Sequence, residues 1–408
     1  MTRTDAEQRA SALKARPTGA TGICFVFAVL AWGSVLYSHS VYMDTLMQIH
    51  GWSASLISSA VFMFWIASLP GTLSVGVLVD RYGPPPVFAI GGLCIGGSLI
   101  ALGHVSAPWQ LFATYAVMGF GYPAMTAAAI SATLVPWYQR GFGAALGVAL
   151  TGASVGGATV PVLIVQSTAV AGFTTTMTVT GTVLLAIVFV AVAILAAIGR
   201  PHEGGGEDRP LIPFSMGEVA RRPLFWKISA GVSLGLGGQV GFLSHQVPVV
   251  ALTGDRLFAS LMVTVVAVAA ALGRLGIGLL SRSLPVSWLT AISYLLHGLG
   301  IAMVALAQTQ AMIIAGCAVA GLVVGAIVML PPIIVREAFG SNGFGRTFAM
   351  VNVAMYTVAA VAPWIVGLLR DGTGGYGTGL TLLVVMEAAG AATILYAMRG
   401  ISQRNDGA

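Results

Sequence analysis

The sequence predicts an all-α membrane protein of twelve transmembrane helices arranged as two pseudo-symmetric six-helix bundles. Of the 408 residues, 57% are hydrophobic and 8% are charged, whereas an ordinary soluble domain has about 25% charged residues. Apolar stretches of about 20 residues, the length needed to cross a bilayer, recur along the chain. Glycine motifs also repeat once between the two halves of the chain, which indicates a duplicated unit.

Hydropathy and helix-breaking residues place the spans along nearly the whole chain. The predicted spans are 20–44, 53–79, 86–104, 109–135, 140–165, 173–198, 225–250, 256–281, 286–307, 310–335, 344–369 and 378–398. The segments between them are short and hold nearly every charge. The chain is therefore expected to be a membrane domain throughout.

Basic residues are distributed unevenly over the connecting segments. Of the 19 Lys and Arg residues, Arg274 falls inside a predicted span. Arg256 and Arg370 alone fall on one side of the membrane, and all the others fall on the opposite side. Because basic residues concentrate on the cytoplasmic side, both termini are predicted to be cytosolic. This bias also accounts for the pI of about 9.5 without a nucleic-acid partner. We expect a multi-pass integral protein of a bacterial inner membrane.

The longest polar stretch divides the chain into two halves. The predicted organisation is a cytosolic tail (1–19), an amino-terminal six-helix bundle (20–199), a cytosolic linker (200–224), a carboxyl-terminal six-helix bundle (225–399) and a second cytosolic tail (400–408). Gly76 near the end of span two corresponds to Gly278 near the end of span eight. Gly141 at the opening of span five corresponds to Gly343 at the opening of span eleven, and both pairs are separated by 202 residues. Parallel repeats with substrate bound between them are one architecture of secondary transporters.

The loop after span two carries a motif with a known counterpart. Gly76-Val-Leu-Val-Asp80-Arg81-Tyr82-Gly83 resembles the cytoplasmic loop signature of the major facilitator superfamily, Gly-x-Leu-x-Asp-Arg-x-Gly followed by basic residues. Here Pro84–Pro86 replace the basic residues. The resemblance implies the major facilitator fold, transport by alternating access, and a conformational latch at the helix ends, in which span two lies close to span eleven. The predicted latch residues are Gly76, Asp80, Arg81, Arg140, Gly278 and Arg282.

Three further segments narrow the resemblance. They are Gly51-Trp52-Ser53 before span two, Gly121-Tyr122-Pro123-Ala124 in span four, and Trp137 to Gly147 entering span five. These segments are similar to the monocarboxylate-porter and oxalate/formate-antiporter branch, which has Trp-Phe-x-x-Arg-Arg-Gly-x-Ala-x-Gly at the last of these places. Gln139-Arg140 stands here for the usual double basic pair.

Arg274 is the main candidate for binding substrate. It lies 18 residues after Arg256 in an apolar span, about 27 Å along a helix, and a buried Arg normally faces a cavity or a partner. The alternative is that its side chain reaches the cytoplasmic surface, as long basic side chains can. In monocarboxylate porters an Arg four residues before the motif glycine holds the substrate carboxylate, and Arg274 and Gly278 stand in that relation. A guanidinium also suits a carboxylate, because the two groups pair through two hydrogen bonds.

Other polar residues in the spans complete the predicted substrate site. They are Tyr37 in span one, Tyr122 before Pro123 in span four, His245 in span seven, and Asn352 and Tyr356 in span eleven. Oxalate-type relatives place a Lys near Asn352, whereas this chain has no Lys after Lys227. A single intramembrane cation favours a substrate with one carboxylate over a substrate with two. For Tyr122, hydrogen bonding to a backbone carbonyl is the alternative role.

Two residues are candidates for coupling transport to a proton. The monocarboxylate porters often place an acid four residues before the Arg, but Ala270 occupies that position here. His245 has an ordinary pKa near neutrality, and Asp44 lies near the outer end of span one. The alternatives are a packing role for His245 and exposure to lipid headgroups for Asp44. His39 and His297 are weaker candidates, the latter because span nine is normally peripheral in this fold.

The expected function is secondary active transport of a small organic anion, a monocarboxylate by preference, together with a proton and by a functional monomer. The alternatives are a neutral-metabolite transporter and a drug or cation exporter of the same fold. An exporter of cations should carry an acid within the membrane, for which Asp44 is the candidate. Neither a Gly-x-x-x-x-Gly-Lys nucleotide loop nor a catalytic or metal-binding cluster is present in the sequence. The chain is thus not expected to be an enzyme or to bind a cofactor or metal.

Overall fold

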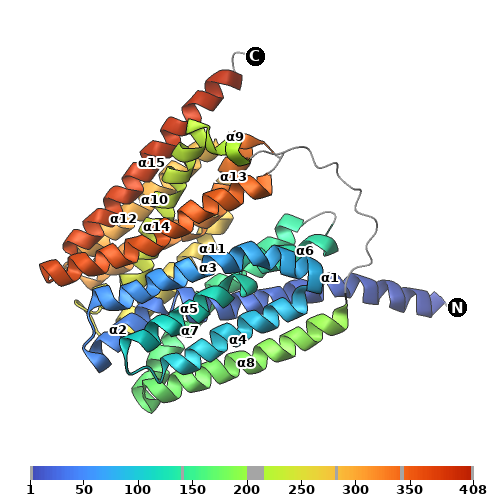
Figure 1. The fold of residues 1–408 in the computed structure, drawn as a ribbon, viewed down its shortest axis with the longest axis horizontal. Helices are drawn as coiled ribbons and strands as arrows, with labels where there is room; N and C mark the ends of the chain where they lie inside the picture. The colour runs from blue at the N-terminus through green and yellow to red at the C-terminus, as the bar shows by residue number, and fades with distance from the viewer. Residues whose placement is uncertain (1–2, 139–141, 200–215, 281–283, 341–343, 406–408) are drawn as a thin grey trace. The chain divides into compact units, whose positions relative to one another are not determined.

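The computed structural model describes residues 3–138, 142–199, 216–280, 284–340 and 344–405, and within these ranges every regular element is a helix (Figure 1). Six elements or groups of elements make up the first half. They are α1 (Arg3–Ala31) with η1 (Trp32–Leu36) and α2 (His39–His50); α3 (Ala54–Tyr82); α4 (Pro84–Leu102); α5 (Pro108–Gly121) with η2 (Tyr122–Met125), α6 (Ala127–Leu134) and η3 (Val135–Trp137); α7 (Phe142–Ala171); and α8 (Phe173–Ile198).

The second half begins with the short helix α9 (Met216–Ala220). Six long helices follow: α10 (Pro223–Val250), α11 (Arg256–Leu280), α12 (Val286–Ala305), α13 (Gln310–Phe339), α14 (Phe344–Thr373) and α15 (Gly377–Asn405). The all-α fold class and the repeated long spans are thereby confirmed, with predicted and observed boundaries a few residues apart.

Eleven helical segments of the described chain are long and apolar enough to cross a membrane, and α10 is the long helix outside that set. The reason lies in its composition, since α10 carries Ser229, Ser233, Gln239, His245 and Gln246. All five of these side chains are buried within the protein. A helix that faces other helices on most sides does not need the apolar surface that lipid requires. We therefore count α10 as the seventh of twelve spans.

The duplication predicted from glycines is visible in the helix boundaries. Helices α3, α4, α5 and α7 begin at residues 54, 84, 108 and 142, and α11, α12, α13 and α14 begin at 256, 286, 310 and 344. Each corresponding pair of starts is separated by 202 residues, the offset of the glycine motifs. The motif positions Gly141 and Gly343 themselves lie outside the described residues.

The helices pack into two compact units. Unit 1 contains residues Met1–Leu36 and Ala67–Arg209, and unit 2 contains Tyr37–Ile66 and Pro210–Ala408. In unit 1, α1 packs along α7 and α4 packs along α8; in unit 2, α10 packs against α14 and α15, and α13 packs against α11 and α12. The segment that contains α2 and the first half of α3 belongs to unit 2 and packs against α10.

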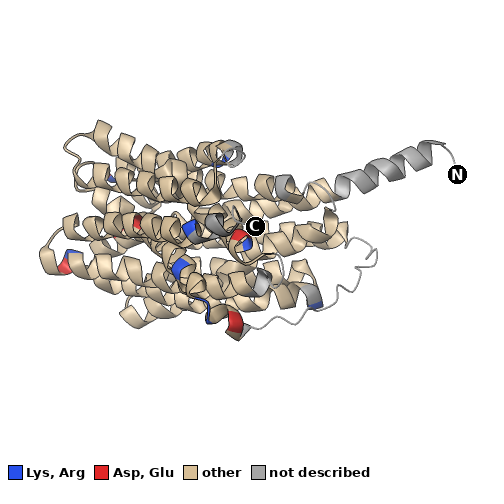
Figure 2. Ribbon diagram, turned by 90° about the horizontal axis from the view of Figure 1, so that it is seen from above, with Lys and Arg blue, Asp and Glu red and all other residues tan. Residues whose placement is uncertain are grey.

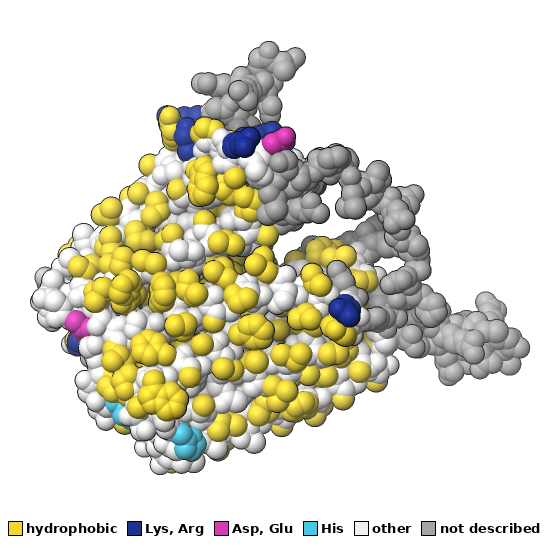
Figure 3. Space-filling model, in the orientation of Figure 1, with side chains coloured by type: hydrophobic (Ala, Val, Ile, Leu, Met, Phe, Trp, Pro, Cys, Tyr) yellow, Lys and Arg dark blue, Asp and Glu magenta, His cyan; other side chains and the backbone are white. Residues whose placement is uncertain are grey.

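The helices present apolar side chains outward. Large hydrophobic side chains such as Leu163 and Val170 on α7 and Leu272 on α11 are exposed, and yellow apolar atoms cover much of the face shown in Figure 3. Charged residues, coloured blue and red, are sparse along the described ribbon (Figure 2). A hydrocarbon environment explains this surface, because lipid tails solvate apolar groups and leave charges without partners. The chain is a multi-pass integral membrane protein.

Glycines allow α1 and α7 to approach closely within unit 1. A Cβ added to Gly156 would meet the backbone carbonyl of Val29 and would lie 3.0 Å from the Cα of Gly33. Gly152, one turn earlier on α7, would likewise meet the carbonyl of Phe25. Small residues spaced in this way let membrane helices pack backbone to backbone.

We expect Gly156→Ala to destabilise unit 1 by about 1–3 kcal/mol, the usual cost of overpacking a tight contact. The measurement is the thermal unfolding temperature of the purified protein in detergent. Gly147→Ala is the matched control, because Gly147 lies on the same helix and has no atom within 4 Å of its Cβ position. Equal unfolding temperatures for the two variants would contradict the close approach of α1 and α7.

Candidate substrate and coupling site

Arg274 is held in unit 2 by residues of span one and of α13. Its side chain is half-buried, and its guanidinium is hydrogen bonded to the hydroxyl of Tyr37. The stem of Arg274 crosses Gly325 of α13, where a Cβ would lie 2.8 Å from the Nε atom. Gly273, the preceding residue, packs on the backbone of Leu322. The small residues of α11 and α13 thus make room for a cation inside an apolar part of unit 2.

Span one is interrupted next to Tyr37. A π-helix covers Trp32–Leu36, Tyr37 and Ser38 form a turn, and α2 begins at His39. π-Helical segments occur frequently at functional sites, and interrupted helices form the binding sites of many transporters. Tyr37 is buried, with 2% of its surface exposed. The interruption therefore presents a phenol to Arg274 at a place where the helix is irregular.

Aromatic side chains connect α3 with α14 in unit 2. The rings of Trp65 and Tyr356 lie 5.2 Å apart between centroids, and Trp65 also contacts Phe64 edge to face at 5.4 Å. Phe64 in turn contacts the ring of His39 at 5.0 Å. Asn352, one turn before Tyr356 on α14, is half-buried. The contact of Trp65 with Tyr356 could not be predicted from the sequence, since a single Trp in an apolar span carries no distinguishing pattern.

Tyr122 belongs to unit 1, where it lies at a second helix interruption. Helix α5 ends at Gly121, and the 3₁₀ segment η2 begins at Tyr122, because Pro123 has no amide hydrogen to continue the α-helical pattern. The ring of Tyr122 is 6.0 Å from that of Trp32, the first residue of the π-helix. The interruptions of spans one and four therefore meet within unit 1. A joint role for Tyr122 and Arg274 stays a prediction.

Asp44 forms an ion pair at the end of unit 2 where α2 joins α3. Its Oδ2 atom lies 3.0 Å from Nε of Arg256 and accepts a hydrogen bond from Gln48 at 3.0 Å. The carboxylate is largely buried, with 8% of the residue exposed. This pairing gives Asp44 a structural role at the start of α11, and its predicted role in proton coupling stays untested.

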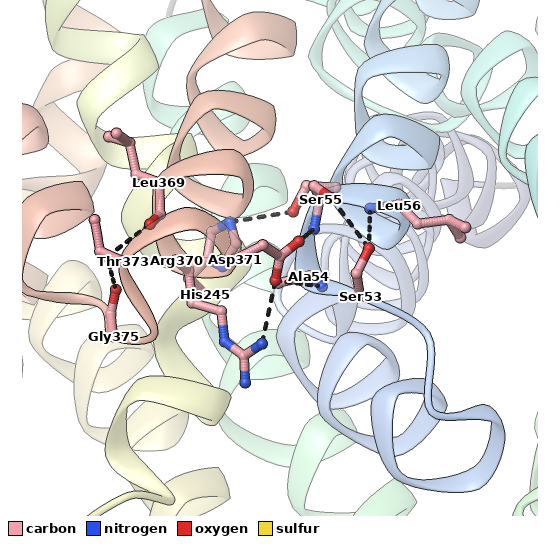
Figure 4. A network of polar contacts seen from close by, with 11 residues as sticks. Ser53, Ala54, Ser55, Leu56, His245, Leu369, Arg370, Asp371, Thr373 and Gly375 are labelled. Carbon is pink, nitrogen blue, oxygen red and sulfur yellow. Dashed lines mark hydrogen bonds and ion pairs between the residues drawn. The ribbon is translucent and has the colours of Figure 1, made fainter.

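Asp371 of α14 caps the first turn of α3. Its Oδ2 atom accepts a hydrogen bond from the backbone N–H of Ser55 at 2.8 Å, and its Oδ1 atom accepts from Ala54 at 3.3 Å and from Arg370 at 3.1 Å. Figure 4 shows the carboxylate between the Arg370 guanidinium and these two backbone nitrogens. The first N–H groups of a helix have no partner within the helix. Asp371 supplies that partner from a helix more than 300 positions away in the chain.

His245 lies beside this cap and joins α10 to α3 and α14. Its Nε2 atom is 2.9 Å from the carbonyl oxygen of Pro363 and 3.2 Å from Oγ of Ser58. Because a carbonyl only accepts, Nε2 carries the hydrogen. Nδ1 is buried and has no hydrogen-bond partner among the described residues. His245 is thus both a helix-packing residue and a ring with one nitrogen available to a proton.

Tyr376 closes the same end of unit 2. Its ring contacts His245 at 5.5 Å and the Arg370 guanidinium at 5.8 Å. Burial raises the pKa of Tyr376 to about 12, so that the phenol is neutral at physiological pH. It can donate or accept a hydrogen bond here without adding charge to the neighbouring Arg370 and Asp371.

The predicted latch is only partly within the described residues. Gly76 and Arg81 are exposed on α3, and the Arg81 guanidinium lies 5.2 Å from the ring centroid of Tyr82. Arg140 and Arg282 fall outside the described part of the chain, as do the side chain of Asp80 and the surroundings of Gly278. The latch and its approach to span eleven stay predictions.

One buried acid was missed by the sequence analysis. Glu387 of α15 is fully buried and forms a 2.6 Å contact with Nδ1 of His297 on α12. The expectation that Asp44 is the only candidate acid within the membrane is therefore wrong, because Glu387 is a second one. Spacing along the chain could not reveal the partner, since the two residues are 90 positions apart; the acid within a predicted span was the available signal.

These features define a multi-pass transport protein with interrupted helices around polar groups. A family model described as Major Facilitator Superfamily matches residues 21–363, and the chain belongs to this superfamily. Two solved structures share the fold, both of a bacterial homologue of the human lysosomal transporter Spinster. The inward-facing, unoccupied form aligns with 13% identity, a TM-score of 0.70 and coverage of 95% of this chain and 97% of that one. The occupied form aligns with 14% identity, a TM-score of 0.69 and coverage of 94% and 96%.

A curated relative is the agnestins efflux protein AgnL12 of Paecilomyces divaricatus. It is 26% identical over 214 residues, which cover 52% of this chain and 47% of the relative. The match therefore spans about half the length of that protein.

We expect Asp371→Ala to destabilise the protein by about 0.5–2 kcal/mol, as loss of a helix cap does. Asp371→Asn should lie between this variant and wild type, because it keeps an acceptor oxygen and loses the charge. Thermal unfolding in detergent is the measurement, with Glu337→Ala as control, since Glu337 is exposed on α13. An Asp371→Ala protein as stable as this control would show that the cap contributes nothing to folding.

Proposed function

We propose that the chain is a secondary active transporter that moves a small organic anion, a monocarboxylate by preference, together with a proton and by alternating access. Transport of small molecules across a membrane is the activity of the superfamily. The anion, the proton and the mechanism are our proposals. We further propose that it acts as a monomer in a bacterial inner membrane, with both termini in the cytosol.

The observation that carries this proposal is the placement of Arg274. A guanidinium half-buried in an apolar helix, hydrogen bonded to Tyr37 at an interruption of span one, is a fixed positive charge beside a neutral donor. An Arg within a membrane span costs at least about 2.5–3.5 kcal/mol on insertion scales. A carboxylate binding there would offset this cost with two charge-assisted hydrogen bonds. The phenol of Tyr37 would donate a further hydrogen bond or orient the guanidinium.

The number of cations supports a substrate with one carboxylate. No Lys follows Lys227 in the sequence, and α14 presents Asn352 and Tyr356 where oxalate-type relatives place a second cation. These two groups form hydrogen bonds without adding charge. A dianion at this site would leave one carboxylate without a cationic partner. We propose Tyr37, Tyr122, His245, Asn352 and Tyr356 as neutral groups that complete the site around Arg274.

A proton would remove the electrical cost of anion uptake. Moving one negative charge into a negative-inside cell costs about 2.3 kcal/mol per 100 mV, whereas an anion and a proton move together without net charge. Nδ1 of His245 has no partner among the described residues, which favours His245 over the paired Asp44 as a carrier of that proton.

A second candidate is export of a larger organic compound, because the printed name of the curated relative describes efflux. The two candidates differ in their response to simple acids. Small monocarboxylates should compete for the first kind of site and leave the second unaffected. Transport measured in proteoliposomes with the proton gradient imposed in each direction would then distinguish import from export.

We expect Arg274→Lys to reduce monocarboxylate transport by at least about tenfold while the protein stays folded, because an ammonium cannot form the planar, two-bond pairing of a guanidinium. Radiolabelled uptake in proteoliposomes is the measurement, normalised to reconstituted protein. Arg336→Lys is the matched control, since Arg336 is exposed on α13. Near-normal uptake by Arg274→Ala would reject the substrate role and leave a surface-directed side chain as the explanation.

We also expect monocarboxylates to inhibit labelled uptake more strongly than dicarboxylates of matched length. A second carboxylate buried without a cation loses its hydration and gains no ion pair. Competition should be measured at a pH where both carboxyl groups are ionised. Stronger inhibition by the dicarboxylates would mean that a second cationic group acts at the site.

A further inference from the structure

The interior of unit 2 contains a second polar centre formed by α10, α12 and α15. Nδ1 of His297 lies 2.6 Å from Oε1 of Glu387, and neither side chain is exposed. His297 also contacts the ring of Phe242 edge to face at 6.0 Å. A fully buried carboxylic acid in a membrane protein is costly unless it is paired or neutralised. The free energy that it costs to bury this pair must therefore be offset by a contribution to stability, or the pair must serve specificity or function.

Glycines of α10 make room for this centre. A Cβ at Gly238 would meet Oε1 of Glu387, and a Cβ at Gly235 would meet the ring of Tyr294. Gly298 on α12 would place a Cβ 3.3 Å from the Cβ of Glu387. Three helices thus approach closely around the acid, the imidazole and the phenol.

Three buried polar atoms of this centre are not hydrogen bonded to other described residues. The buried atoms Nε2 of His297, Oε2 of Glu387 and the hydroxyl of Tyr294 have no hydrogen-bond partner among the described residues. Besides His297, the titratable phenol of Tyr294 interacts with the charge of Glu387. On α10, Lys227 and His245 lie 11 and 7 residues from Gly238, about 16 and about 10 Å along the helix. The charge of the pair is therefore set mainly by its own protons.

The number of protons on the pair decides its net charge. With one proton shared between a neutral imidazole and a carboxylate, the charges sum to zero whichever group carries it. Without that proton, a carboxylate remains buried without compensation. With a second proton, an uncompensated cation remains. Either net charge is expensive in a low-dielectric interior, so the one-proton form is the stable one while the three helices stay packed.

The same segment of α10 contacts the candidate substrate helix. Gly237, beside Gly238, would place a Cβ 2.7 Å from Val358, two residues after Tyr356 on α14. A change of charge at Glu387 therefore acts on a helix contact adjacent to the residues proposed for substrate binding. Because glycine contacts leave little free space, separation of α10 from α15 is the direct response to a buried charge.

We infer that His297 and Glu387 form a proton-binding site that takes up one proton in the interior of α10, α12 and α15. The site is distinct from Arg274 and Tyr37. As the coupling site for transport, where it takes the place proposed above for His245, it rests on the proposed function, in which a proton accompanies the anion. As a proton-binding site it is testable without any substrate. The alternative is that the pair only fixes the packing of α12 against α15.

The first test needs no transport. Thermal unfolding of the purified protein should be followed between about pH 6 and about pH 9. Removal of the shared proton leaves a buried anion, so the unfolding temperature of wild type should fall as the pH rises. Glu387→Gln cannot form that anion and should show a smaller pH dependence. Glu337→Gln, an exposed acid changed in the same way, should behave as wild type.

The second test separates coupling from packing. One pH unit provides about tenfold accumulation for each co-transported proton. Glu387→Gln and His297→Gln should lose this accumulation and retain exchange of labelled for unlabelled monocarboxylate at equal pH. His104→Gln is the control, because His104 is exposed. A purely structural pair would predict that accumulation and exchange fall together.

The outcomes distinguish the two proposals. If wild type does not transport monocarboxylates but Glu387→Gln abolishes the pH dependence of unfolding, the proposed substrate is wrong and the proton site stands. If Glu387→Gln keeps both the accumulation and the pH dependence of wild type, the proton site is wrong. Should Glu387→Gln fail to fold, infrared difference spectra of wild type and His297→Gln decide the question. The carbonyl band of protonated Glu387 should then titrate at a different pH in the variant, and identical titrations would overturn the inference.

Discussion

The hydrocarbon interior of the bilayer offers no partner to a charge or a backbone polar group, and the polar architecture of this protein follows from that constraint. Arg274 reaches Tyr37, Asp44 reaches Arg256, Asp371 reaches the amide groups of α3, and Glu387 reaches His297. In each case the partner comes from another span. The charges that a soluble protein would expose to water therefore become contacts that join helices.

Helix α10 is central to unit 2 because of its composition. Its glycines let α14 and α15 approach, and its polar side chains are covered by protein. His245 near one end of α10 lies in the cluster with Asp371, whereas Gly238 in the middle faces Glu387. A rigid helix that contacts both centres is a physical route by which protonation at one place could affect the other. The mean hydropathy of α10 is low because the helix carries the polar side chains and glycines that make these contacts.

Irregular backbone accompanies the candidate substrate residues. The π-helix before Tyr37 and the 3₁₀ segment at Tyr122 occur in spans that are otherwise α-helical. Such interruptions expose backbone groups that a regular helix would satisfy internally. They suit a site that must bind a polar substrate and release it, because the same groups can bond to protein or to ligand.

Much of the fold was predictable from sequence, since the length and apolar character of each span are local properties. The glycine repeat at 202 residues also predicted the duplication, which the starts of four helix pairs reproduce. Arg274 could be singled out because a cation in an apolar span is unusual by itself. The proline that follows Tyr122 likewise pointed to that residue, and the ordinary pKa of a histidine pointed to His245.

Partners, by contrast, were decided only by the tertiary structure. Glu387 and His297 are 90 positions apart, and Asp371 is 317 positions from Ala54, so no pattern along the chain relates them. Pairing depends on which faces of the helices pack together and on where glycines let them approach. Hydropathy determines that a helix enters the membrane, whereas side-chain packing determines which buried charge meets which partner.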